Sequence, residues 1–215
     1  MHLKGKIIAL SGVDGCGKTS VIEELRNALS KEDKGSRYVW LRYNHRLTKF
    51  LLALCRFSGF TKYENIGGVR IGYHEFYRSK IISYLFILFT YLDTFFATLV
   101  AVYMPALLSR KVVICDRWIF DIMVDLEVDT GIVFVQENFL SKVFKRIVPK
   151  GAHCFLLQRD QQELTKLRKE NVLDKNFSKR LQLYQQHSID PLICVVNNNK
   201  SIRDAVNQIL VACNS

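Results

Sequence analysis

The stretch GVDGCGKTS at residues 12–20 combines residue types that bind phosphate through both backbone and side chain. Its spacing is Gly, four residues, then Gly-Lys-Thr. Glycine adopts torsions that other residues avoid, so successive N–H groups can converge on phosphate oxygens at the start of a helix. Lys18 can reach the β- and γ-phosphates of a nucleotide, and the Thr19 hydroxyl can ligate Mg²⁺. The stretch therefore predicts a phosphate-binding loop.

The residues on either side of this loop favour the same interpretation. The apolar run KIIALS at residues 6–11 is typical of a buried strand, and apolar residues recur at helical spacing after the loop. Strand, glycine-rich turn and helix is the context that the loop requires. We expect the following residues to surround the nucleotide: Gly12, Val13, Asp14, Gly15, Cys16, Gly17, Lys18, Thr19 and Ser20.

A second motif, VICDRW at residues 113–118, places charged residues at the end of an apolar run. The run is typical of a central parallel strand, and ligands of open α/β sheets bind where such strands end. Asp116 could hold Mg²⁺ or accept a proton from an attacking oxygen. Arg117 offers a planar fork for a second phosphate. We therefore expect Lys18, Asp116 and Arg117 to be catalytic, with Thr19 and Asp116 at the metal.

Residues 159–180 follow another predicted strand, at residues 151–158, and are rich in cations. The pattern indicates two basic helices joined near residues 171–175. Such a pair could close over the transferring phosphate and exclude water, with Arg168 as the catalytic cation. A solvated helical hairpin is the alternative. The cations are Arg159, Lys166, Arg168, Lys169, Lys175, Lys179 and Arg180.

Residues 81–108 are long and apolar enough to be a transmembrane candidate. Two arguments oppose a span. Asp93 in its middle would cost about 3 kcal/mol in a bilayer, and a span would separate the phosphate loop from Asp116. We expect instead a helix buried between the sheet and its neighbours, with Asp93 facing the acceptor pocket or a polar partner.

Composition indicates one folded domain over residues 1–215, without linkers or repeats. The net charge of +11 is spread along the chain, which favours phosphorylated small molecules over nucleic acid. Six scattered cysteines without a C-x-x-C pair are typical of reduced thiols. With no signal-peptide pattern at the amino terminus, we expect a cytoplasmic protein. The sequence leaves open whether the protein forms a homodimer.

The motifs GVDGCGKT, VICDRW and LRKENVLDKNFSKRLQLY, in that order, resemble the thymidylate kinase family among P-loop nucleoside monophosphate kinases. The resemblance implies a three-layer P-loop NTPase fold, with a five-stranded parallel sheet, helices on both faces and a helical lid near residues 159–180. It also implies ATP and Mg²⁺ as cofactors and transfer of the γ-phosphoryl group to a nucleoside monophosphate, dTMP first. Asp14 and Arg117 would face the acceptor, and Lys18 would hold the donor.

Two departures from the family pattern bear on the acceptor. The family commonly carries an Asp-Arg pair in the helix before the second motif, where this chain has Asp93-Thr94. Its Arg-Glu-Pro turn after the second strand is also absent. Asp93 is therefore expected at the substrate. The replacement cations would come from Arg42, Arg46, Arg70 or Arg78, of which we favour Arg42 and Arg78.

Two other functions stay open. A deoxynucleoside kinase, or another small-molecule P-loop kinase, would use the same chemistry on a different acceptor. A nucleotide-binding module with little catalysis could use residues 47–62 as an interfacial helix, which leaves peripheral contact with a membrane open although we do not expect it.

Overall fold

A computed structural model describes residues 6–42, 46–66, 69–109, 111–134, 138–167 and 174–214 of the chain. Its centre is a five-stranded sheet in the order β2-β5-β1-β6-β7, and all neighbouring strands are parallel. The strands are β1 (Ile7–Ser11), β2 (Ser36–Trp40), β5 (Val112–Asp116), β6 (His153–Gln158) and β7 (Ile193–Asn197). Leu10 pairs with Asp116, so β1 and β5 end at the same edge of the sheet. The predicted three-layer α/β fold is confirmed.

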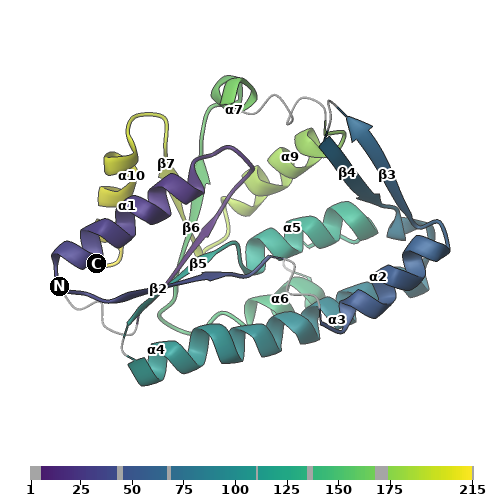
Figure 1. Ribbon diagram of the computed structural model, residues 1–215, viewed down its shortest axis with the longest axis horizontal. Helices are drawn as coiled ribbons and strands as arrows, with labels where there is room; N and C mark the ends of the chain where they lie inside the picture. The colour runs from purple at the N-terminus through teal and green to yellow at the C-terminus, as the bar shows by residue number, and fades with distance from the viewer. Residues whose placement is uncertain are drawn as a thin grey trace.

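Alternating residues of the central strands support two separate cores, because successive side chains of a strand point to opposite faces. Ile8 and Leu10 of β1 pack with α1, α7, α9 and α10. Ile7 and Ala9 pack with α2, α3 and α6 on the other face. Figure 1 shows these two helical layers on either side of the sheet. The helices are α1 (Lys18–Lys31), α2 (Thr48–Phe57), α3 (Lys80–Thr98), α6 (Phe139–Lys145), α7 (Gln161–Leu167), α9 (Phe177–His187) and α10 (Ile202–Ala212), with α5 (Ile119–Thr130) contributing to both cores.

An antiparallel hairpin of β3 (Thr61–Ile66) and β4 (Val69–His74) forms a second, two-stranded sheet. It lies at the end of the molecule opposite β7 and α10 (Figure 1). A short 3₁₀ turn, η1 (Phe76–Arg78), leads from the hairpin into the long helix. This hairpin was not predicted from the sequence.

The expected long helix is present as α3 (Lys80–Thr98), η2 (Leu99–Tyr103) and α4 (Met104–Ser109). The π-helical turn η2 ends two residues before Pro105, which lacks an N–H donor and crowds the preceding turn. Within the described part of the chain, residues 80–109 are also the helix whose length and composition would suit a membrane span. The expectation that this helix is buried is correct for its inner face only, because most of its large apolar side chains are exposed.

Gly12 provides a test of how tightly the loop after β1 packs. Its φ is +145°, and a Cβ there would lie 2.7 Å from the Leu157 carbonyl oxygen and 2.8 Å from Cys16 Sγ. We predict that Gly12→Ala lowers the free energy of unfolding by about 2–4 kcal/mol, through backbone strain and overpacking together. Gly151→Ala is the matched control, because Gly151 has φ +89° but no atom within 4 Å of its Cβ position. It should cost only about 1–2 kcal/mol. Urea unfolding of both variants measures the difference, and equal losses would contradict the close packing.

Candidate active site

The predicted phosphate-binding loop connects β1 to α1 and curves around the ammonium group of Lys18. Gly15 and Gly17 have φ values of +91° and +95°, as the sequence pattern requires. Lys18 is buried, and its Nζ donates to the carbonyl oxygens of Gly12 at 2.7 Å and Val13 at 2.9 Å. Asn198 directly follows β7. Its Nδ2 donates to the Cys16 carbonyl oxygen at 2.8 Å and so fixes the position of the loop relative to β7.

Asp116 ends β5 beside this loop and has one carboxylate oxygen available. Tyr38 of β2 donates its hydroxyl to Asp116 Oδ2 at 2.9 Å. Burial, and then the hydrogen bond to Asp116, raise the pKa of Tyr38 to about 12, so this donor stays protonated. Asp116 Oδ1 is buried and makes no hydrogen bond with any described residue. A buried acceptor without a partner fits a cation or a proton donor from a ligand.

The donor set near the loop fits Mg²⁺ better than a metal held by protein alone. Thr19 is exposed at the first turn of α1, and Asp116 offers Oδ1. Among the described residues, no group of three or more His, Cys, Asp or Glu side chains could hold a metal ion. Mg²⁺ commonly uses one or two protein ligands together with substrate phosphates and water. Thr19 and Asp116 would therefore hold Mg²⁺ only when a nucleotide is bound.

Arg117 follows β5 in a conformation that turns its side chain back under the loop. Its φ is +60°, which is uncommon for a residue with a Cβ. Its Nη1 donates to Asp121 Oδ1 at 3.2 Å, and its Nη2 donates to Asp14 Oδ1. Burial works to lower the pKa of Arg117, but the Asp121 carboxylate leads the interactions that raise it above its ordinary value. The guanidinium group is therefore a fixed, buried positive charge.

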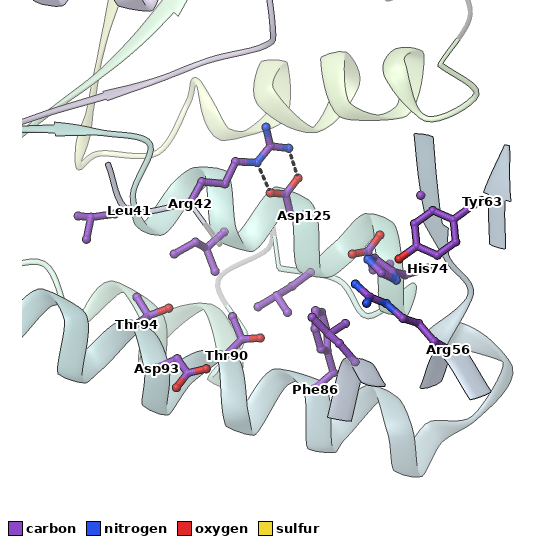
Figure 2. Close-up of a pocket in the computed structure, with 15 residues that line it drawn as sticks. Leu41, Arg42, Arg56, Tyr63, His74, Phe86, Thr90, Asp93, Thr94 and Asp125 are labelled. Atoms are coloured by element: carbon purple, nitrogen blue, oxygen red, sulfur yellow. Dashed lines mark hydrogen bonds and ion pairs between the residues drawn. The ribbon is translucent and has the colours of Figure 1, made fainter. Parts of the chain in front are cut away.

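Arg42, after β2, is the second buried cation at this place. It forms a two-pronged ion pair with Asp125 of α5, with both N···O distances 2.8 Å (Figure 2). Its Nη1 also lies 3.5 Å from Asp14 Oδ2. The Asp14 carboxylate, whose side chain is 43% exposed, thus lies between the two guanidinium groups of Arg42 and Arg117. This arrangement forms an anion site beside the phosphate-binding loop.

A cavity of about 230 Å³ adjoins the anion site and shares Arg42 with it. Arg42 and Asp125 lie at one end of the cavity, and Arg56, Tyr63 and His74 lie at the other (Figure 2). The hairpin, α2, α3 and α5 all contribute to its wall, which combines apolar and aromatic surface with a few charges, as small-molecule sites usually do. The remaining lining residues are Leu41, Leu52, Gly72, Phe86, Thr90, Asp93, Thr94, Ile122, Leu126 and Asp129.

Asp93 lies in the cavity wall, but its carboxylate is already fully engaged. It accepts backbone N–H bonds from Arg46 at 2.9 Å, Leu47 at 2.9 Å and Thr48 at 3.0 Å. The Thr48 hydroxyl adds a fourth bond at 2.7 Å. Burial would raise the pKa of Asp93, but these hydrogen bonds lower it below its ordinary value. The predicted polar partner of Asp93 is therefore the start of α2, which Asp93 caps.

Sequence reasoning missed three carboxylates of α5 that organise the site. Asp121, with no exposed surface, accepts from Arg117, the Trp118 N–H at 3.2 Å and the Tyr184 hydroxyl at 2.7 Å. Asp125 binds Arg42, and Asp129 follows one turn later in the cavity wall. These carboxylates recur every four residues on the helix after VICDRW, and this spacing indicates that they share one face of the helix.

Arg78, another predicted substrate cation, lies away from the anion site. Arg78 donates to the Gly59 carbonyl oxygen and to Glu75, both at 3.3 Å, and it lies over the Phe60 ring. The structure does not place it in the cavity wall. Arg168, and with it the centre of the predicted lid, lies outside the described residues, as does the side chain of Arg70. The flanking helices α7 and α9 of the lid are present.

Comparison with known proteins gives a structural likeness without a sequence match. No family model matches the chain, and no curated protein matches it significantly. The thymidylate kinase of Ehrlichia chaffeensis superposes with a TM-score of 0.57 at 13% identity, covering 99% of this chain and 100% of that one. The enzyme of Candida albicans gives a TM-score of 0.59 at 16% identity, covering 98% and 92% of the two chains. The chain has the fold of a thymidylate kinase. At these identities, activity must be argued from the site.

Asp129 gives the site a predicted pH dependence. Burial, followed by repulsion from Asp125, raises the pKa of Asp129 to about 8. The unfolded chain releases this proton near pH 4, so between about pH 4 and pH 8 the folded state binds one proton more and loses stability as pH rises. We predict that Asp129→Asn gains at least about 1 kcal/mol relative to the wild type between pH 5 and pH 8.5 in urea unfolding. The exposed Asp33→Asn is the control, and parallel pH profiles for all three proteins would contradict the assignment.

Proposed function

We propose that this protein transfers the γ-phosphoryl group of ATP to a nucleoside monophosphate, with dTMP as the first candidate. Three features support this activity together. They are the phosphate-binding loop with Lys18, the anion site between Arg42 and Arg117, and the cavity next to that site. The likeness in fold to thymidylate kinases agrees with the proposal.

The anion site is the observation that carries the proposal. In it the Asp14 carboxylate stands in for an oxyanion of the acceptor. Arg42 and Arg117 are buried and held by Asp125 and Asp121, whereas Asp14 is half-exposed and belongs to the glycine-rich loop. An incoming phosphate could displace Asp14, because it offers more acceptor oxygens to the same two planar donors. A hydroxyl acceptor would have no use for two fixed cations.

The phosphate-binding loop would hold the phosphates of ATP, the phosphoryl donor. Lys18 would turn from the Gly12 and Val13 carbonyl oxygens to the β- and γ-phosphates of ATP. Mg²⁺ held by Thr19 and Asp116 would neutralise charge on those phosphates when bound. The acceptor anion site at Asp14, a residue of the loop itself, would then lie next to the donor phosphates, as transfer between them requires.

The cavity would hold the rest of the acceptor. Since Arg42 belongs to both the anion site and the cavity, an acceptor phosphate at Arg42 directs its sugar and base into the cavity. The side chains of Tyr63, His74 and Phe86 there offer flat surfaces to a base. Catalysis by Arg168 from a closing lid stays a prediction.

One observation favours a second candidate, a kinase with a hydroxyl acceptor. Asp116 Oδ1 is buried without a hydrogen bond, so it could take a proton from an attacking hydroxyl group. A nucleoside or another small polyol would then be the substrate. The two candidates differ in whether the acceptor needs a phosphate.

Substitution of Lys18 tests whether the loop holds the phosphates of ATP. We predict that Lys18→Ala lowers kcat for ADP formation by at least about 10²-fold, since one preorganised charge contact to the transferring phosphates is lost. The measurement is coupled ADP release with MgATP and dTMP. Lys31→Ala, at the exposed far end of α1, should leave kcat unchanged. Normal turnover by Lys18→Ala would contradict the role of the loop.

The two arginines test the acceptor side. We predict that dTMP is used with a kcat/KM at least about tenfold above thymidine. Arg117→Lys and Arg42→Lys should each raise the acceptor KM by about tenfold or more and change the ATP KM little, because lysine keeps the charge but loses the planar fork. Arg203→Lys, with its side chain 87% exposed, is the control. Turnover of nucleosides alone, with unchanged acceptor KM in both variants, would favour the hydroxyl-acceptor candidate instead.

A further inference from the structure

Asp116 presents only one of its two carboxylate oxygens to a ligand. Oδ2 accepts the hydroxyl group of Tyr38 at 2.9 Å, whereas Oδ1 is buried and has no hydrogen bond to any described residue. The two oxygens of one side chain therefore have different tasks. Oδ2 is tied to the protein, and Oδ1 is left for whatever binds beside the loop.

The backbone of Asp116 is fixed by both neighbouring strands, so only its side chain can still turn. The Asp116 carbonyl oxygen accepts the Leu41 N–H at 3.1 Å, directly after β2. The next N–H, that of Arg117, donates to the Leu10 carbonyl oxygen of β1 at 3.0 Å. Rotation about the side-chain bonds could still exchange Oδ1 and Oδ2. The hydrogen bond from Tyr38 opposes this rotation.

Tyr38 is placed to orient Asp116 and contributes little to the core. Trp40 pairs with Asp116 in the register of β2 and β5, and Tyr38 lies two residues earlier on the same face of β2. Its side chain therefore reaches along the sheet toward the end of β5. Because β2 is an edge strand and Tyr38 is 43% exposed, loss of its hydroxyl group should leave the fold intact.

The number of oxygens that a carboxylate can offer matters to the choice of metal. Mg²⁺ demands nearly octahedral ligands at about 2.0–2.1 Å. Ca²⁺ accepts more ligands at about 2.3–2.6 Å in a flexible arrangement, and it binds carboxylates through one oxygen or through both. A carboxylate that is tied at one oxygen meets the demand of Mg²⁺ and withholds the second oxygen that Ca²⁺ can use.

We propose that Tyr38 is a positioning residue that holds Asp116 as a one-oxygen ligand and thereby favours Mg²⁺ over Ca²⁺ at the bound nucleotide. This inference rests on the proposed function, because it assumes a nucleotide and its metal at the phosphate-binding loop. It also bears on the acceptor. While Oδ1 holds the metal, Asp116 has no free oxygen to take a proton from an attacking hydroxyl group, which favours an acceptor that carries a phosphate.

Calorimetric titration with a non-hydrolysable ATP analogue, in excess Mg²⁺ or excess Ca²⁺, tests the proposal. The wild type should bind the analogue at least about tenfold more tightly with Mg²⁺. Tyr38→Phe should weaken binding with Mg²⁺ by about tenfold or more, as is usual when a metal ligand loses its hydrogen-bond partner, and change binding with Ca²⁺ little. Tyr103→Phe is the matched control, because the Tyr103 hydroxyl donates to the Ile147 carbonyl oxygen at 3.1 Å. It should bind the analogue as the wild type does.

A double-mutant cycle tests whether Tyr38 acts through Asp116. Adding Tyr38→Phe to Asp116→Asn should change binding with Mg²⁺ by less than about twofold, because no carboxylate is left for Tyr38 to hold. A full tenfold loss in that background would overturn the proposal. So would unchanged binding by Tyr38→Phe, or an equal loss with Mg²⁺ and Ca²⁺, which is the result of a purely structural role.

These outcomes are separate from failure of the proposed function, because binding of the analogue requires no acceptor. If the wild type does not bind the analogue with either metal, the loop assignment fails and both proposals fall. If the wild type phosphorylates dTMP but Tyr38→Phe keeps the wild-type preference for Mg²⁺, only this inference fails. Should Tyr38→Phe not fold, a crystal structure of the wild type with Mg²⁺ and the analogue decides. Asp116 with Oδ1 toward the metal and Oδ2 on Tyr38 supports the proposal, and both oxygens on the metal reject it.

Discussion

The buried carboxylate of Asp121 is the constraint on which the rest of the site depends. It receives hydrogen bonds from four parts of the chain: the loop after β1 through the Gly12 N–H at 3.4 Å, the end of β5 through Arg117, the start of α5 through the Trp118 N–H, and α9 through the Tyr184 hydroxyl. A carboxylate without solvent must be paired to remain charged. Removing it would leave the half-exposed Asp14 as the carboxylate partner of the buried Arg117 and would release the loop from α5 and α9 at once.

Under the proposed function, the same constraint prepares the acceptor side in advance. Asp121 holds Arg117, and Asp125, one turn later, holds Arg42 with two hydrogen bonds. Arg180 of α9 adds a further contact, 3.6 Å from Asp125. Both guanidinium groups are therefore fixed before any substrate binds, and only Asp14 between them has to move. Fixed charges of this kind stabilise a transferring phosphoryl group without a further cost of reorganisation.

The local motifs could be predicted from the sequence, and the contacts between distant segments could not. The loop at residues 12–20 and Asp116 are short, contiguous patterns, and the structure has the strand, turn and helix that they require. The pairing of Arg42 with Asp125 joins residues 83 positions apart, and no local pattern indicates it. Likewise, Asp93 has the charge of a substrate ligand, but its four donors come from a segment 45–47 residues earlier. For the long helix, hydropathy cannot tell which face is covered, because both faces carry large apolar side chains.

Under the proposed function, the Asp14 carboxylate marks the position of the acceptor phosphate between Arg42 and Arg117. A crystal structure with dTMP and a non-hydrolysable ATP analogue tests it most directly. We expect phosphate oxygens within hydrogen-bond distance, about 2.7–3.2 Å, of both guanidinium groups, with Asp14 moved away from Arg117 and the base in the cavity beside Phe86. A complex in which Asp14 still binds both arginines while dTMP lies elsewhere would contradict it.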